Sequence, residues 1–72
     1  MVRLSPEKRL GARIREVREA KGLSQMDLVR KRNWTLSHYQ KIERGDLDPR
    51  YSTLRKVAKS FGVTVSELLK GL

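Results

Sequence analysis

The segment that most restricts the fold of this chain begins at Gly22 and reads GLSQMDLVRKRNWTLSHYQKIERG. Ser24 is a favourable N-cap, because its hydroxyl can accept a hydrogen bond from a free N–H group of the first helical turn. Asn33 suits the end of that helix, because Asn adopts positive φ more readily than other residues that carry a side chain. Thr35 can then cap a second helix. We therefore predict helices over residues 25–32 and 36–44, joined by a short turn.

Start and stop signals elsewhere predict three further helices. Ser5 and Pro6 stand in the usual order of N-cap and first helical residue, and Gly22 ends the helix that they begin. Thr64 and Glu67 have the spacing of a capping box, which predicts the start of the last helix. These signals place helices at about 6–21, 51–60 and 65–69. No segment alternates strictly between polar and apolar residues, so we predict an all-α fold with five helices.

Apolar residues at helical spacing indicate one shared core. We expect it to contain Leu10, Ile14, Val17, Leu23, Leu28, Val29, Trp34, Tyr39, Ile42, Leu54, Val57, Ala58, Phe61, Val63 and Leu68. A chain of 72 residues has room for a single domain, over 1–72, in which the two short helices form a unit at about 24–44. The sequence has no cysteine, so apolar packing must stabilise this small core without disulfides.

The chain is strongly basic, with 17 Lys and Arg against 8 Asp and Glu and a net charge of +9. Small basic domains commonly bind nucleic acid or an anionic membrane surface. No run approaches the roughly 18 apolar residues of a membrane span, and the first residues lack the apolar region of a secretory signal. We therefore expect a cytoplasmic protein that does not bind membranes.

The composition also argues against an enzyme. A single histidine and no cysteine cannot build a catalytic zinc site. The histidine, His38, has no acidic partner or second histidine that would support catalysis, and a packing or solvated role suits it better than a DNA contact. We expect no metal, no cofactor and no catalytic residue.

The second short helix has one polar, cationic side. Tyr39 and Ile42 are three residues apart and must point inward together. At about 100° per residue, the opposite side carries Ser37, Gln40, Lys41 and Arg44. An ordinary solvated helix face is the simpler interpretation of these residues. The preceding capped helix and the basic charge favour the alternative, in which this side reads base edges in a DNA groove.

Three motifs carry a family resemblance: SQ at Ser24–Gln25, IERG at Ile42–Gly45 and FGVTVSELL at Phe61–Leu69. Together they resemble the Xre-type, lambda-repressor-like helix-turn-helix family, over a stretch from about Leu10 to Leu69. The resemblance implies sequence-specific binding of double-stranded DNA by a prokaryotic or phage transcription regulator. It also implies that the helix over 36–44 is the recognition helix, which lies in the major groove.

The resemblance and the side-chain chemistry assign contacts to individual residues. The predicted base-contacting residues are Leu36, Ser37 and Lys41 from the family pattern and Gln40 from its chemistry. The predicted phosphate-contacting residues are Gln25, Arg44 and Arg50. A phosphate at Gln25 would meet a helix N-terminus, and the resemblance favours this role over that of an ordinary polar residue at a helix start. Family members with the same pair also imply an ion pair between Arg18 and Glu43.

Two departures from the family pattern affect the expected surface. Arg32 replaces a usual aliphatic residue, and we expect it to open that end of its helix to solvent. Asp46 and Asp48 lie in a loop that is often basic, so they should weaken the attraction of this loop for phosphates.

We expect weak homodimers that bind a palindromic operator, because one short recognition helix makes few base contacts. The predicted dimer contact uses Val65, Leu69 and Leu72, which are the apolar residues left near the last helix. An alternative function is a protein-interaction module on the same fold, such as an antitoxin-type domain that binds a partner. A basic membrane-surface peptide would need one long amphipathic helix, which the repeated helix-stop signals contradict.

Overall fold

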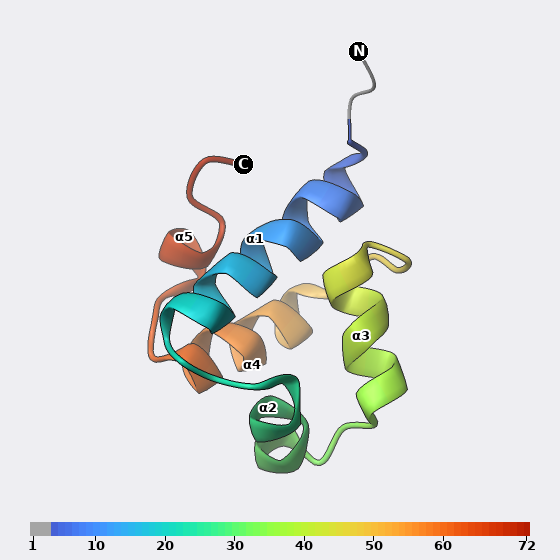
Figure 1. Ribbon diagram of the computed structural model, residues 1–72. Coiled ribbons are helices and arrows are strands. Elements are labelled where there is room, and N and C mark those ends of the chain that lie inside the picture. The colour runs from blue at the N-terminus through green and yellow to red at the C-terminus, as the bar shows by residue number, and fades with distance from the viewer. Residues whose placement is uncertain (1–3) are drawn as a thin grey trace.

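The computed structural model describes residues 4–72 and confirms an all-α fold. Within these residues the chain forms five helices and no strand (Figure 1). The helices are α1 (Pro6–Ala20), α2 (Gln25–Arg32), α3 (Leu36–Arg44), α4 (Tyr51–Phe61) and α5 (Val65–Leu68). The bounds of α2 and α3 agree with the prediction, whereas α1, α4 and α5 each end one residue from the predicted position, which is the ordinary uncertainty of helix ends. The first three residues of the predicted domain lie outside the described part.

Hydroxyl side chains cap four of the five helices. Ser5, Ser24, Thr35 and Thr64 each accept a hydrogen bond from the backbone N–H three residues further on. These local bonds explain why the helix starts were predictable, because each depends only on neighbouring residues. At the start of α4, Arg50 occupies the cap position and its side chain makes no cap hydrogen bond.

The core forms where the helices cross. In Figure 1, α1 runs across the molecule between α3 and α5, while α4 packs against both α2 and α5. Every residue predicted for the core is buried or packs against the buried cluster, so this prediction is confirmed. The structure adds Leu47, Val65 and Leu69 as half-buried members.

A close approach between α1 and α3 depends on Gly11. A Cβ atom at Gly11 would lie 2.3 Å from the carbonyl oxygen of Glu43 and 2.6 Å from that of Ile42. Only glycine leaves room for the backbone of α3 at this point. The position of α3 relative to α1 therefore depends on a residue without a side chain.

The short α5 is held by arginine side chains of α1. Arg13 donates from Nε to the carbonyl oxygen of Leu68 at 3.1 Å and from Nη2 to that of Glu67 at 2.9 Å. Arg9 donates to the carbonyl oxygen of Gly71 at 3.3 Å. A four-residue helix is too short to be stable alone, so these bonds and the burial of Leu68 keep it in place.

The expectation for Arg32 was wrong. Its Nε donates to the hydroxyl of Ser60 at 2.6 Å, and that hydroxyl donates to the carbonyl oxygen of Lys56 at 2.8 Å. Because the long arginine stem can lie along apolar surface, Arg32 is half-buried and closes the end of α2 against α4.

Within residues 4–72, no helix is long and apolar enough to cross a membrane.

Candidate nucleic-acid interface

The turn between α2 and α3 has a fixed backbone geometry. Ser24 and Asp27 exchange hydrogen bonds at the start of α2, and the backbone N–H of Ser24 lowers the pKa of the Asp27 carboxyl. Asn33 ends α2 in the left-handed region, with φ 56° and ψ 38°. The Thr35 hydroxyl then accepts from the backbone N–H of His38 at 3.1 Å. The left-handed Asn33 and the Thr35 cap together fix the direction in which α3 leaves α2.

An aromatic cluster supports the same turn. The ring of Trp34 stacks on Tyr39, with centroids 6.2 Å apart and planes 17° apart. The Trp34 ring also meets the His38 ring edge-on, with ring centroids 5.9 Å apart. Trp34 therefore joins the turn to the buried side of α3, and exposed His38 lies at the border of this packing.

The outward side of α3 is exposed as the sequence predicted. Leu36, Ser37, Lys41 and Arg44 are all exposed and lie on one side of the helix. Tyr39, Ile42 and Glu43 form the opposite, buried side. A rigid scaffold therefore presents one apolar, one hydroxyl and two cationic side chains together. Such a set can contact both base edges and phosphates.

Gln40 and Gln25 form a link between this surface and the interior. Both are half-buried. The Nε2 group of Gln40 donates to Oε1 of Gln25 at 3.3 Å, and Nε2 of Gln25 donates to Oε1 of Glu43 at 3.1 Å. Each amide nitrogen carries two hydrogens, so each glutamine keeps one further N–H available. The two glutamines are far apart in the sequence, and only the crossing of α2 and α3 reveals this link.

Arg18 and Glu43 meet between α1 and α3. Nε of Arg18 lies 2.6 Å from Oε2 of Glu43, Nη2 donates to Oε1 at 3.2 Å, and Nη1 donates to the carbonyl oxygen of Leu23 at 2.8 Å. The two side chains are only 10% and 4% exposed. The fork geometry satisfies both carboxylate oxygens, which a buried charge requires.

The contact between Arg18 and Glu43 shifts the pKa values of both side chains. Burial acts to raise the pKa of Glu43, but hydrogen bonds from Arg18 and its other neighbours outweigh burial and lower it. The hydrogen bond to Glu43 raises the pKa of Arg18 in turn. Burial raises the pKa of nearby Tyr39, whose hydroxyl lies beside Glu43 but is not aligned for a hydrogen bond with any described residue. Both members of the pair therefore remain charged at neutral pH.

Acidic Asp46 partly neutralises the end of α3. Its Oδ2 lies 3.4 Å from Nε of Arg44, and its Oδ1 lies 4.0 Å from Nζ of Lys8. Lys8 also donates to the carbonyl oxygen of Arg44 at 3.3 Å. The sequence indicated a weakening role for Asp46 but not its pairing with Arg44. Asp48 and Arg50, further along the loop, are exposed.

The residues predicted for a dimer contact are not equally available. Val65 and Leu69 are half-buried and pack against the core, whereas Leu72 is 50% exposed. Leu72 shares a hollow with Leu4 and Arg9, and Val65 lines a different hollow, beside α4. The structure does not bring the three side chains into one exposed patch.

Comparisons with known proteins agree with this geometry. Residues 9–70 match the family model described as a helix-turn-helix domain. The chain is 33% identical over 64 residues to the HTH-type transcriptional regulator DdrOP3 of Deinococcus deserti, covering 89% of this chain and 50% of that protein. It is 37% identical over 60 residues to the immunity repressor protein of Bacillus phage phi105, covering 83% of this chain and 42% of that protein. The chain thus spans about half of the length of these relatives.

A solved structure is similar over most of both chains. The crystal structure of the restriction-modification controller protein C.AhdI from Aeromonas hydrophila matches with a TM-score of 0.80 and 32% identity. The match covers 86% of this chain and 94% of that one. The arrangement of the helices is therefore shared, and not only the two-helix motif.

Proposed function

Because this chain belongs to the helix-turn-helix domain family, we propose that it is the sequence-specific, double-stranded DNA-binding domain of a prokaryotic or phage transcription regulator. The observation that carries this proposal is the exposed outward side of α3, held by the capped turn and the buried Arg18–Glu43 pair. The similarity of the chain to a transcriptional regulator, an immunity repressor and a restriction-modification controller protein supports it. Residues 1–72 would act as one domain, in the cytoplasm and without catalysis or cofactors.

Recognition helix α3 would lie in the major groove, and four residues would contact bases. Lys41 can donate to guanine O6 or N7, Ser37 can bond a base edge, and Leu36 can pack against a thymine methyl group. Gln40 can use its second N–H and its oxygen on a base while it remains bonded to Gln25.

Three residues would contact phosphates. Gln25 begins α2, where free backbone N–H groups attract an anion, and its second amide hydrogen is available. Because Glu43 and Gln40 already orient the Gln25 amide, this contact needs little additional ordering. Arg44 and Arg50 would contact phosphates beyond the end of α3, and Arg44 must exchange Asp46 for the phosphate.

A dimer on a palindromic site would double the few contacts that one recognition helix makes. Half-sites would then lie about 34–36 Å apart, one turn of DNA. We propose a weak contact through Val65, Leu69 and Leu72. The exposure of Leu72 supports its part, and the half-buried positions of Val65 and Leu69 leave only their outer atoms for a partner.

The experiment that tests this function begins with selection of bound duplexes from a random DNA pool. The selected duplex and a scrambled duplex are then titrated with the wild type, Lys41→Ala and Lys31→Ala. Lys31 is an exposed cation of α2 outside the proposed interface, so it matches the change in charge. We expect Lys41→Ala to lower the preference for the selected site by about 1–3 kcal/mol.

Lys31→Ala should weaken both duplexes slightly and equally, because it removes only a general attraction to phosphates. Equal losses on both duplexes for Lys41→Ala would remove this residue from the reading role. A pool that yields no enriched sequence would contradict sequence-specific binding altogether.

A further inference from the structure

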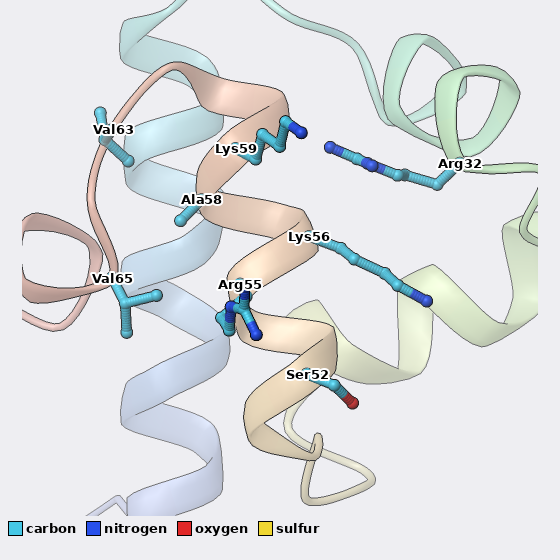
Figure 2. Close-up of a pocket in the computed structure, with 8 residues that line it drawn as sticks. All are labelled: Arg32, Ser52, Arg55, Lys56, Ala58, Lys59, Val63 and Val65. Carbon is cyan, nitrogen blue, oxygen red and sulfur yellow. The ribbon is translucent and has the colours of Figure 1, made fainter.

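A hollow of about 500 Å³ lies on the α4 side of the molecule, and we call it the α4 hollow. Figure 2 shows Arg32 extending from α2 toward Lys56 and Lys59 of α4, with Val63 and Val65 on the α5 side. Ser52, Arg55 and Ala58 of α4 complete its lining of eight residues. The α4 hollow therefore combines an apolar wall on its α5 side with a cationic rim along α4 and at the end of α2.

The positive charge of this rim is not neutralised by the described residues. Four of the eight lining residues are cationic, and none has a carboxylate within 4.0 Å among residues 4–72. Helix α4 contains no acidic residue. By contrast, Arg13 and Arg15 of α1 are paired with Glu16 and Glu19.

One of these cations is held in place before any ligand binds. Nε of Arg32 donates to buried Ser60, so the guanidinium lies at the hollow with its two terminal nitrogens still available. A guanidinium of this kind suits a carboxylate, because it can donate two parallel hydrogen bonds. Because Ser60 already orients this guanidinium, a ligand would bind with a smaller loss of side-chain entropy.

We propose that the α4 hollow binds a short acidic segment of a partner protein, in which carboxylates alternate with apolar side chains. The carboxylates would pair with Arg32, Lys56 and Lys59, and an apolar side chain would contact Val63 and Val65. From Ser52 to Lys59 the axis of α4 rises roughly 10 Å. An extended segment of about three or four residues spans that distance. This interaction goes beyond the proposed DNA binding.

The position of the α4 hollow favours a protein segment over DNA. Arg32 ends α2, whereas Gln25, one of the three proposed phosphate contacts, begins it. Neither α3 nor the other two proposed contacts, Arg44 and Arg50, contribute a lining residue. A DNA backbone would also make no use of the apolar wall formed by Val63 and Val65. A second copy of this chain that docked the same face would bring two cationic rims together, which like-charge repulsion disfavours.

The test measures binding of a fluorescein-labelled peptide in which glutamate and leucine alternate. Two comparison peptides replace either every glutamate by glutamine or every leucine by serine. The groove variant carries Lys56→Glu and Lys59→Glu, both at exposed positions. The matched control carries Lys21→Glu and Lys70→Glu, which change the net charge equally, are exposed and do not line the α4 hollow. Circular dichroism verifies that all proteins are folded.

We expect the groove variant to lose about tenfold or more in affinity for the alternating peptide, and the control variant to lose much less. Both comparison peptides should bind more weakly than the alternating one, and both variants should lose affinity for duplex DNA equally. Equal peptide losses in the two variants would reduce the effect to net charge and overturn the proposal. A larger DNA loss in the groove variant would show that DNA occupies the hollow instead.

Dimerisation must be distinguished from peptide binding, because Val65 belongs both to the α4 hollow and to the proposed dimer contact. Sedimentation of the wild type with and without the peptide separates the two. A peptide that binds the monomer supports the proposal. A wild-type dimer that the peptide cannot bind, and that the groove variant fails to form, would show that a second copy covers the hollow.

Discussion

Among single residues, Glu43 places a buried negative charge in the domain, and the stability of the domain depends on its partners. Its carboxylate is buried, its charge is balanced by Arg18, and it accepts a further hydrogen bond from the neutral amide of Gln25. Removing one member of a buried pair leaves the other charge unpaired, at a cost of up to about 3–5 kcal/mol. We expect Arg18→Ala and Glu43→Ala each to destabilise the domain strongly, and the double variant to lose less than the sum.

A double-mutant cycle measured by urea denaturation checks this expectation. The control cycle uses Arg15 and Glu19, an exposed pair with 63% and 56% of its side chains accessible, whose coupling should be small. A coupling energy near zero for Arg18 and Glu43 would show that the two side chains stabilise the domain independently.

The same residue gives the domain a pH dependence. Because the folded-state pKa of Glu43 is lowered, its contribution to stability is fully present above the ordinary carboxyl pKa of about 4.3. As the pH falls further, the unfolded chain binds the proton first, and the contribution is lost. We expect the free energy of unfolding to decrease as the pH drops below about 4.3. The Glu43→Gln variant should show a smaller decrease over the same pH range.

The control for this measurement is Asp27→Asn, because the pKa of Asp27 is also lowered but its carboxylate is exposed. Denaturant titrations over the acidic range should show a smaller change for that variant than for Glu43→Gln. If Glu43→Gln keeps the full wild-type slope, other carboxylates control the acid stability.

At the scale of elements, we expect the loop after α3 to limit how strongly the proposed recognition helix attracts DNA. Asp46 pairs with Arg44, so a phosphate must displace a carboxylate. An exposed pair is worth about 0–1 kcal/mol, so we expect Asp46→Asn to strengthen binding to all duplexes by up to about fivefold. The gain should shrink at high salt, because screening weakens exposed charges.

Asp48→Asn provides the matched comparison, since Asp48 is exposed and has no cation within 4.0 Å among residues 4–72. Titrations of selected and scrambled duplexes at several salt concentrations separate the two variants. Equal gains for both would show that net charge, and not release of Arg44, is responsible.

At the scale of the whole molecule, the proposed dimer contact is small. Stable interfaces bury about 1,200–2,000 Å² in total, and a few side chains near α5 do not reach this area alone. We expect the free domain to be mostly monomeric at low micromolar concentration and to bind a palindromic site cooperatively. Leu72→Glu should remove that cooperativity and leave half-site affinity nearly unchanged, because Leu72 is 50% exposed and outside the core cluster.

Sedimentation of the free domain and titrations of half-sites and full sites test both parts of this prediction. Ser66→Glu adds the same charge at an exposed position of α5 and serves as the control. A tight dimer without DNA, or cooperativity that Leu72→Glu does not change, would place the contact elsewhere.

The helices, most of the core and the exposed side of α3 could be predicted from the residues alone. These features depend on local chemistry, because a cap such as Ser24 and a stop such as Asn33 act on backbone groups within a few residues. The inward positions of Tyr39 and Ile42 follow from helical spacing in the same way. The family resemblance also led to the Arg18–Glu43 pair, whose contact the structure shows in detail.

Contacts between side chains that are distant in the sequence could be identified only from the packed helices. Gln25 binds Gln40, and Arg32 binds Ser60, because α2 crosses both α3 and α4 at particular angles. Gly11 is required because the backbone of α3 passes directly over it. Helical periodicity specifies the face on which a residue lies, but not the residue opposite it on another helix. That choice depends on the packing of all five helices at once.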